Sequence, residues 1–289
     1  MYIRLMRMRL LVSTLAVCVG VSARASFELL HVLDTGSKTI KRFDSETGAY
    51  LGQYGQQLVN PTGLAYLNGR TYTMDSGTGQ LVAFNAYTGA PLRTVADASI
   101  TAVGTFGNSV VVAKATTTST FVVAQYDQDL NFMANYTWNA PVATGWTPTD
   151  ISANSGLLVT IGPGGWAYAS SLSSTVITGA LALNYKYAGT TVAGTVFGIA
   201  EQSIGNLNPR RDLVGGHVYN YYSGQNSSNV AQGRISVGSA NSSIPNTNMT
   251  FGESVLITPT HLAIQNAPEP GTWVALGLGG LALIRRRKA

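Results

Sequence analysis

The sequence has almost no cysteine: of its 289 residues only Cys18 is one, and it lies in an apolar stretch near the N-terminus. A lone cysteine forms no intramolecular disulfide, and Cys-based metal sites need several thiolates together. The residues after Cys18 therefore offer neither a disulfide framework nor a thiolate nucleophile. We expect packing and hydrogen bonds to supply the stability of the fold.

Several catalytic signatures are also missing. The sequence contains no G-x-S-x-G elbow, H-E-x-x-H motif, P-loop or G-x-G-x-x-G loop. Asp127, Asp129 and Asn131 have the spacing of calcium-loop ligands, but Phe132 stands where such a loop needs glycine and Trp138 where it needs glutamate. We expect a polar hairpin turn there, and we predict no metal, no cofactor and no enzymatic activity.

Charged residues are scarce and unevenly spread. Eight of the 18 lysines and arginines lie before residue 26 or after residue 267, so ten basic residues face twelve acidic ones in between. The formal charge of +5 and the pI of about 9.3 therefore come from the two ends. A mildly acidic body with scattered cations offers no basic stripe for phosphates, which argues against nucleic-acid binding.

The N-terminus has the composition of a secretory signal peptide. Three arginines precede an apolar run at residues 10–21, and an A-x-A cleavage site follows. These residues are Arg4, Arg7 and Arg9, then Ala23-Arg24-Ala25. We predict that residues 1–25 form a signal helix, that the Sec translocon exports the chain, and that signal peptidase leaves Ser26 as the first mature residue.

The C-terminus combines three elements in series: Pro268-Glu269-Pro270, an uncharged stretch at residues 271–284, and a basic end. The basic end consists of Arg285, Arg286, Arg287 and Lys288. A helix over the uncharged stretch reaches only about 21 Å, short of the roughly 30 Å hydrocarbon core, so it suits a temporary hold on the membrane. The four cations are expected to stay on the cytoplasmic side.

This order of elements at residues 267–289 closely resembles the PEP-CTERM sorting signal of Gram-negative bacteria. The resemblance implies processing by an exosortase, a membrane-embedded transpeptidase-like enzyme, with Pro268, Glu269 and Pro270 as substrate residues. It also implies transient insertion in the inner membrane and delivery of the body to the cell surface or the medium. An ordinary C-terminal anchor is the alternative, but it would be longer and would not need the Pro-Glu-Pro element.

The body, residues 26–266, is predicted to be nearly all strand and turn, because short runs of β-branched and aromatic residues recur between Gly, Asn and Asp turns. Residues 33–44 are matched 41 residues later by residues 74–85. Each copy contains an Asp-[Thr/Ser]-Gly turn and a strand that ends in Phe-[Asp/Asn], and a Thr-Gly turn follows. With one more strand at residues 60–66, the period is that of a four-stranded β-propeller blade.

We therefore predict an all-β fold: a β-propeller of about five or six four-stranded blades, flanked by the signal helix and a short C-terminal transmembrane helix. Weaker echoes place Tyr126 and Tyr168 at the position of Phe84, and residues 149–152 and 196–199 are expected to open later blades. Residues 225–229 and 239–248 are expected to be long loops. A β-sandwich or a β-solenoid is the main alternative.

The first blade lacks an opening strand of its own, because Ser26 immediately precedes the first predicted strand at residues 27–33. Residues 260–264 can supply it and close the ring by pairing the two ends of the body, which removes open sheet edges. Residues 44–48 and 60–65, Asp-Ser-Glu-Thr-Gly and Asn-Pro-Thr-Gly-Leu-Ala, resemble the YVTN/NHL-type propellers of secreted and surface proteins. That resemblance implies a fold and no particular chemistry.

Two groups of residues are candidates for a site in the body. His31, His217 and His261 are the histidines, and a closed ring would place His31 and His261 on neighbouring strands, although a lone histidine in a strand more often packs in the core. Trp138, Trp146 and Trp166 could form a stacking platform for sugar rings, or they could fill the core between blades, which is the more common role.

Two classes of function follow from these patterns. The favoured one is a non-enzymatic surface or extracellular-matrix protein that binds exopolysaccharide or surface proteins through a rigid repeat scaffold. The alternative is a secreted propeller lyase or hydrolase acting on glycans, which would need acidic or histidine side chains that converge in the central channel.

Overall fold

The computed structural model describes residues 29–115, 120–139, 147–148, 150–154, 157–162, 165–169, 171–173, 177–178, 186–188, 197–201, 210–215, 219–222, 235–239 and 246–265. These residues belong to one compact unit, Glu28–Gln265. Every regular element within them is a β-strand, which confirms the all-β prediction. The predicted signal and sorting segments, residues 1–25 and 267–289, lie outside the described residues.

Three four-stranded antiparallel sheets come from the N-terminal repeats and the end of the body. The first has the order β22-β1-β2-β3 and contains β22 (Pro259–Gln265), β1 (Leu29–Asp34), β2 (Thr39–Asp44) and β3 (Tyr50–Tyr54). The second contains β4 (Pro61–Leu67), β5 (Arg70–Asp75), β6 (Gln80–Asn85) and β7 (Pro91–Ala96). The third contains β8 (Ile100–Phe106), β9 (Ser109–Ala115), β10 (Thr120–Tyr126) and β11 (Phe132–Asn139).

Two further sheets follow. The fourth contains β12 (Asp150–Asn154), β13 (Leu157–Gly162), β14 (Gly165–Ala169) and β15 (Ile177–Thr178), so the strand expected at residues 149–152 does open a sheet. The fifth has six strands: β16 (Lys186–Ala188), β17 (Phe197–Glu201), β18 (Arg210–Gly215), β19 (Tyr219–Tyr222), β20 (Ile235–Ser239) and β21 (Asn246–Phe251). The expected loop at residues 239–248 is therefore too long, because β21 already begins at Asn246.

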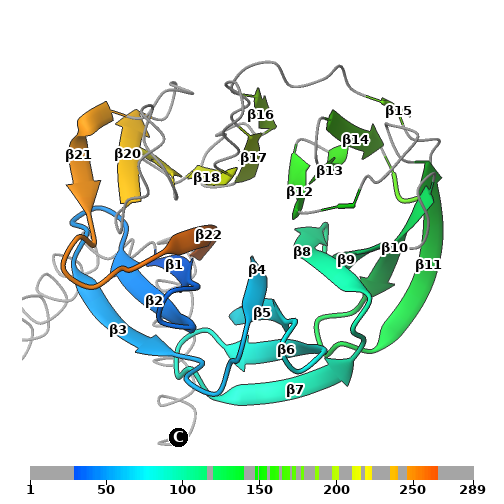
Figure 1. Ribbon diagram of the computed structural model, residues 1–289, viewed down its shortest axis with the longest axis horizontal. Coiled ribbons are helices and arrows are strands. Elements are labelled where there is room, and N and C mark those ends of the chain that lie inside the picture. Colours follow the sequence, from blue (N-terminus) through cyan, green and yellow to red (C-terminus); the bar gives the residue numbers. More distant parts are fainter. Residues whose placement is uncertain are drawn as a thin grey trace, which may run out of the picture. The chain divides into compact units, whose positions relative to one another are not determined.

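The five sheets surround a common centre (Figure 1). The first four sheets direct an edge strand inward, β22, β4, β8 and β12, whereas the fifth sheet contacts its neighbours through its middle strands β17 and β18. Neighbouring sheets touch through their inner strands: β22 contacts β4, β4 contacts β8, β8 contacts β12 and β12 contacts β17. Contacts between β18 and β22 complete the circle. The sheets thus form a closed ring rather than an open stack.

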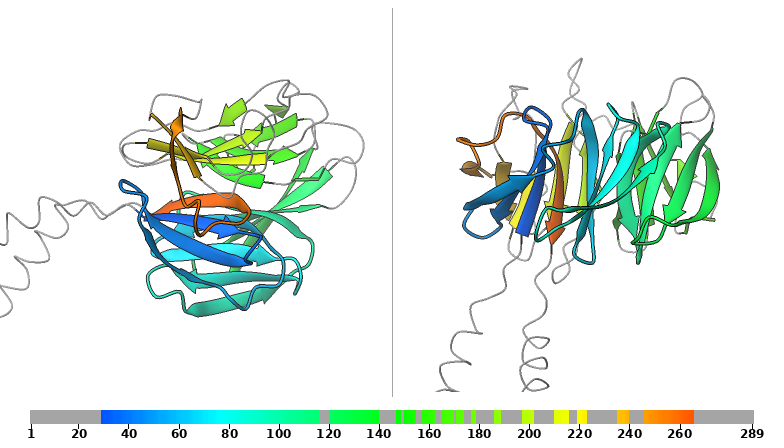
Figure 2. Two further views of the ribbon diagram at one scale, coloured as in Figure 1. Left: turned by 60° about the vertical axis from the view of Figure 1, so that its left-hand side comes forward. Right: turned by 90° about the horizontal axis from the view of Figure 1, so that it is seen from below.

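The ring is closed by the pairing of β22 with β1, as the sequence predicts. The two strands are antiparallel, and their register places Leu29 opposite Gln265 and Leu33 opposite His261. Figure 2 shows the two strands, orange and blue, side by side in both views. The first and last described residues of the body are therefore direct partners in one sheet.

The inner strands share a short pattern and a register shift. Residues 61–65, Pro-Thr-Gly-Leu-Ala, recur as Pro-Thr-His-Leu-Ala at residues 259–263 and as Ile-Thr-Ala-Val-Gly at residues 100–104. In each strand the register with the neighbouring strand shifts within this pattern. The shift falls at Thr260 in β22 and at Thr101 in β8, the second position of the pattern, and between Thr62 and Ala65 in β4. Such irregularities are typical of β-bulges, which bend a strand locally.

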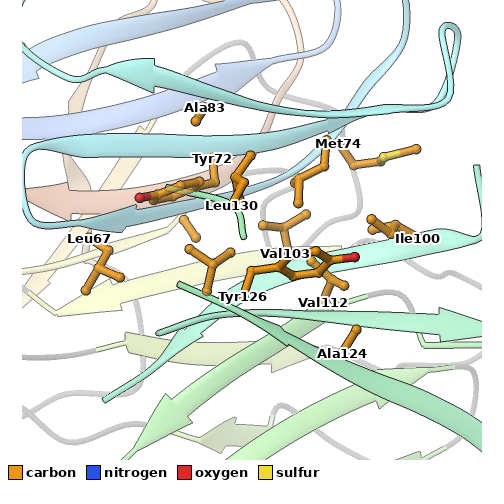
Figure 3. Close-up of a cluster of buried hydrophobic side chains, with 13 residues drawn as sticks. Leu67, Tyr72, Met74, Ala83, Ile100, Val103, Val112, Ala124, Tyr126 and Leu130 are labelled. Carbon is orange, nitrogen blue, oxygen red and sulfur yellow. The ribbon is translucent and has the colours of Figure 1, made fainter. Parts of the chain in front are cut away.

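The hydrophobic core is divided among the interfaces between neighbouring sheets. One cluster joins the second and third sheets, where Tyr72 and Met74 of β5 lie near Val103, Val112 and Tyr126 of the next sheet (Figure 3). Similar clusters join the first sheet to the second and the third to the fourth. Each sheet is therefore stabilised by its neighbours, which is how repeat folds bury their apolar surface.

Candidate functional site

The sites predicted at the two ends lie outside the described residues. They are the sorting residues Pro268, Glu269, Pro270, Arg285, Arg286, Arg287 and Lys288, and the cleavage residues Ala23, Ala25 and Ser26. Among the residues that the structure does describe, no helix has the length and apolar character needed to cross a membrane, and no three potential ligands gather into a metal site. Within the body, two groups of buried polar residues stand out.

Asp34, the last residue of β1, holds the segment that leads into the closing strand. Its carboxylate accepts hydrogen bonds from the backbone N–H groups of Ile257, at 3.1 Å, and Thr258, at 2.6 Å. Ser37 Oγ donates to it at 2.8 Å, and Lys41 Nζ lies 2.5 Å away. Burial alone would raise the pKa of Asp34, but these donors outweigh burial and hold its pKa below the usual value.

Asp75, 41 residues further on, holds the corresponding segment of the second sheet, the one that leads into β4. Its carboxylate accepts hydrogen bonds from the N–H groups of Asn60, at 2.7 Å, Val59, at 3.1 Å, and Gly77, at 3.2 Å, and from Thr78 Oγ1 at 3.0 Å. Burial acts to raise the pKa of Asp75, and these bonds lower it further than burial raises it. We call Asp34 and Asp75 the Asp clamps, because each fixes the chain segment in front of an inner strand.

In the third sheet a lysine on the second strand holds the incoming segment through an aspartate of that segment. Lys114 occupies the clamp position, since it lies opposite Ile100, the first residue of its inner strand. Its Nζ lies 2.6 Å from the carboxylate of Asp97, which belongs to the segment that leads into β8. In these three sheets the position carries a polar contact to the incoming segment, and either sign of charge provides it. In the fourth sheet Ile161 occupies the position, opposite Asp150, the first residue of β12.

The rest of the Asp-[Thr/Ser]-Gly turn acts on the same segment. In the second sheet, Ser76 N–H donates to the carbonyl oxygen of Asn60 at 3.0 Å. A Cβ on Gly77 would lie 2.7 Å from Cγ1 of Val59, so only glycine lets the valine pack there. The first sheet repeats both contacts with Thr35 and Gly36 against Thr258 and Ile257. The motif found in the sequence is therefore structural.

His31 forms the second buried polar group, and it is fully buried between the first and second sheets. Its Nε2 lies 3.1 Å from Gln265 Oε1 on the closing strand, and its Nδ1 lies 3.0 Å from the hydroxyl of Tyr54 on β3. The Tyr54 hydroxyl in turn lies 2.8 Å from Thr71 Oγ1 on β5. The ring of Tyr66 on β4 stacks on the imidazole, with the centroids 6.0 Å apart.

These surroundings keep His31 neutral. Burial is the largest effect and lowers the pKa of His31 to about 4. The hydrogen bond to Gln265 acts to raise this pKa, and the positive charge of Arg42 acts to lower it. Arg42 lies directly opposite His31 on β2 and 5.7 Å from the centre of the Tyr54 ring. Burial likewise raises the pKa of Tyr54 and raises that of Tyr66 to about 12. At neutral pH the cluster therefore holds one cation and no other charge.

The two histidines of the predicted pair lie on neighbouring strands of one sheet. His31 and His261 lie on the neighbouring strands β1 and β22, as expected, with His261 opposite Leu33. The imidazole of His31 is hydrogen-bonded on both nitrogens and closed to solvent, as expected for a histidine that packs in the core. His261 Nδ1 lies 3.1 Å from Thr260 Oγ1. His217 lies outside the described residues.

For Trp138 the structure supports the core alternative rather than a ligand platform. Its side chain is 1% exposed, packs edge-on against Phe121 and donates a hydrogen bond to the carbonyl oxygen of Leu172 at 3.0 Å. Trp146 lies outside the described residues, and of Trp166 only the backbone, in β14, is described. Trp138 therefore has the core role, and for Trp146 and Trp166 the choice between core and platform stays a prediction.

Comparison with known proteins identifies the C-terminal segment. Residues 266–288 match the model of the PEP-CTERM protein-sorting motif. The chain carries a PEP-CTERM sorting motif. Such a motif implies an exported protein that an exosortase sorts toward the cell surface, with the exosortase as its processing partner. No curated protein sequence matches this chain.

Solved structures agree with the ring of antiparallel sheets. A protein of unknown function from Bacteroides caccae is 9% identical, with a TM-score of 0.55 over 83% of this chain and 99% of its own. A chain of the nidogen/laminin complex is 13% identical, with a TM-score of 0.56 over 82% of this chain and 98% of its own. At such low identity the likeness concerns the fold alone, which is β-propeller-like.

The sequence showed the Asp clamps as part of a repeated turn, but it did not reveal the backbone N–H groups that bond to them. The cluster around His31 was missed because Gln265, Tyr54 and Thr71 lie far apart in the chain and share no spacing. The pattern Pro-Thr-x-Leu-Ala could have revealed the closing strand directly, since it links residues 259–263 to residues 61–65.

Proposed function

We propose that this PEP-CTERM protein is a non-enzymatic scaffold of the cell surface or extracellular matrix that binds envelope exopolysaccharide. The observation that supports a scaffold is the use of three of the buried ionisable groups: Asp34, Asp75 and His31 are engaged in holding sheets or their connections. A group spent on such contacts is a poor general acid or base, because it cannot reach a substrate.

We also propose that the body is a five-bladed propeller spanning residues 26–266. The closed series of contacts from β22 through β4, β8, β12 and β17 supports five blades, with the six-stranded sheet as the fifth. On this proposal the Sec translocon exports the chain, signal peptidase removes residues 1–25, and the C-terminal helix holds the chain transiently in the inner membrane of a Gram-negative cell before the exosortase acts.

The scaffold proposal is tested with the processed protein and the exopolysaccharide of its own producing strain. We expect the protein to co-sediment with the polysaccharide in a saturable way while the polymer keeps its length. Shortening of the polymer, with new reducing or unsaturated ends, would indicate a lyase or hydrolase and contradict the proposal. Absence of co-sedimentation would also count against it and would leave surface proteins as the partners to examine.

A further inference from the structure

The closing strand is fixed at its C-terminal end by a chain of three buried hydrogen bonds. It runs from Gln265 on β22 to His31 on β1, then to Tyr54 on β3 and Thr71 on β5. We call these four residues the latch. It joins the last described residue of the body to strands of both the first and the second sheet, so the closing strand cannot separate without breaking it.

The latch fits only one pattern of donors when His31 is neutral. The amide oxygen of Gln265 only accepts hydrogen bonds, so His31 Nε2 carries the proton and donates it. His31 Nδ1 must then accept from the Tyr54 hydroxyl, which in turn accepts from Thr71. A second proton on His31 would turn Nδ1 into a donor and force the Tyr54 and Thr71 hydroxyls to reverse.

The surrounding groups oppose a charge on His31. Arg42 on β2 is the cation beside it, and Tyr54 on β3 and Tyr66 on β4 are neutral. On the same strands Asp34 and Lys41 pair with each other, Arg70 pairs with Asp129, and His261 lies opposite Leu33. Two further carboxylates bond to backbone N–H groups: Asp44 at the end of β2 to those of Glu46 and Thr47, and Asp75 at the end of β5 to those of Val59 and Asn60. The contacts described for His31 include no carboxylate that could stabilise an imidazolium.

We propose that the latch is an acid-sensitive lock on the closing strand: protonation of His31 releases the C-terminal end of β22 from β1 while the other sheets stay folded. This device is independent of the proposed scaffold function. β22 ends at Gln265, immediately before the matched motif at residues 266–288. Release of the C-terminal end of β22 would therefore place unpaired residues between the folded body and the motif.

Hydrogen exchange measured by mass spectrometry on the full chain in mild detergent tests the lock. After correction for intrinsic exchange, we expect opening of peptides from β1 and β22 to rise about 20-fold between pH 7 and pH 5, as a shift of the His31 pKa from 6.5 to about 4 requires. Peptides from β5, β6, β9 and β10 should stay protected. An equal rise in all of these strands would mean general acid unfolding and would overturn the proposal.

Two variants and a control separate His31 from other titrating groups. His31→Gln should remove the pH dependence of β22 opening, whatever its opening at pH 7. Gln265→Glu should also reduce it, because a carboxylate facing Nε2 favours the imidazolium. His261→Gln, on the same strand pair, should keep the 20-fold rise. If β22 opening rises as much in His31→Gln as in the wild type, or fails to rise in His261→Gln, the lock is contradicted. If neither latch variant folds, the comparison between strands of the wild-type protein decides.

Discussion

At the scale of single residues, the connections between sheets depend on side chains that bond to backbone N–H groups. Asp34 and Asp75 each satisfy two such groups in the segment that leads into an inner strand. Hydrogen bonds to charged groups contribute about 1.5–3 kcal/mol each to stability. The clamps therefore stabilise the ring mainly through these bonds to backbone N–H groups.

Replacing one clamp should destabilise the protein far more than replacing an exposed carboxylate. We expect Asp75→Ala to lower the free energy of unfolding by about 2–4 kcal/mol, since it leaves the N–H groups of Val59 and Asn60 unpaired. Asp129→Ala, which removes a surface ion pair with Arg70, should cost less than about 1 kcal/mol. Urea unfolding of both variants gives the comparison, and equal losses would refute the role of the clamp.

The glycine of the turn motif should be sensitive for a steric reason. Gly77→Ala would place a Cβ 2.7 Å from Val59, so we expect a loss of about 1–3 kcal/mol. Val59 supplies two of the atoms near that Cβ, Cγ1 at 2.7 Å and its own Cβ at 2.8 Å, while the backbone N of Asn60 lies 3.1 Å away. The double variant Gly77→Ala with Val59→Gly removes the first two atoms, so it should recover part of the loss relative to Val59→Gly alone. Strict additivity in this double-mutant cycle would show that the two residues do not interact.

At the scale of elements, the sequence predicted the strands of the repeating unit better than the strands of the later sheets. The 41-residue repeat located β1, β2, β5 and β6, because turns that require Asp, Gly or Asn leave a mark in a single sequence. The closing role of residues 260–264 followed from the missing first strand. The six-stranded fifth sheet could not be predicted, because its strands carry no copy of the turn motif that would have marked them in the sequence.

The outer strands show a regularity that the sequence alone did not reveal. In β3, β7 and β11 a register shift makes Leu51, Leu92 and Met133 the extra residue of a bulge, and these positions are 41 residues apart. All three side chains are exposed. Bulges of this kind twist an edge strand away from flat pairing with another sheet, which limits edge-to-edge aggregation.

The closure of the ring can be tested by a cross-link. The chain has no cysteine after Cys18, and Leu29 lies directly opposite Gln265, where Cβ atoms are about 5 Å apart. We expect the variant Leu29→Cys with Gln265→Cys to form a disulfide within one chain. The long closed loop favours a gain of up to about 5 kcal/mol, which the loss of the hydrogen bond between Gln265 and His31 reduces.

A matched control pairs Leu29→Cys with Thr137→Cys, which lies in a different sheet. It should remain reduced under the same conditions. Mass analysis of the free thiols distinguishes the two variants. A free thiol pair at residues 29 and 265 in folded protein would mean that the two ends of the body are not paired.

At the scale of the whole molecule, stability should depend on pH in two ranges. His31 has a pKa of about 4 in the folded protein, below its usual value near 6.5, so the unfolded chain binds the extra proton and stability falls as the pH drops from about 6.5 to 4. The Asp clamps have lowered pKa values, so their contribution is complete above about pH 4 and is lost below it as they protonate.

Urea unfolding at pH 7 and pH 4.5 measures the upper range. The shift of His31 predicts a loss of about 2–3 kcal/mol between these two pH values. The variant His31→Gln should lose much less over the same interval, although it can be less stable throughout. A wild-type protein as stable at pH 4.5 as at pH 7 would contradict a neutral, buried His31.

The sorting motif governs the fate of the whole molecule, because the motif that residues 266–288 match directs the chain to an exosortase. The body brings its two ends together at Leu29 and Gln265, so both terminal segments leave the body from one strand pair. Replacing Pro268-Glu269-Pro270 by three alanines should leave the body folded and block its release from the inner membrane.

The most direct test is the intact mass of the native protein in each cell fraction of its producing strain. The account predicts a surface or extracellular species that begins at Ser26 and ends near Pro268-Glu269-Pro270, without the apolar stretch and the four terminal cations. A protein found only in the inner membrane, with its C-terminus intact through Ala289, would contradict it.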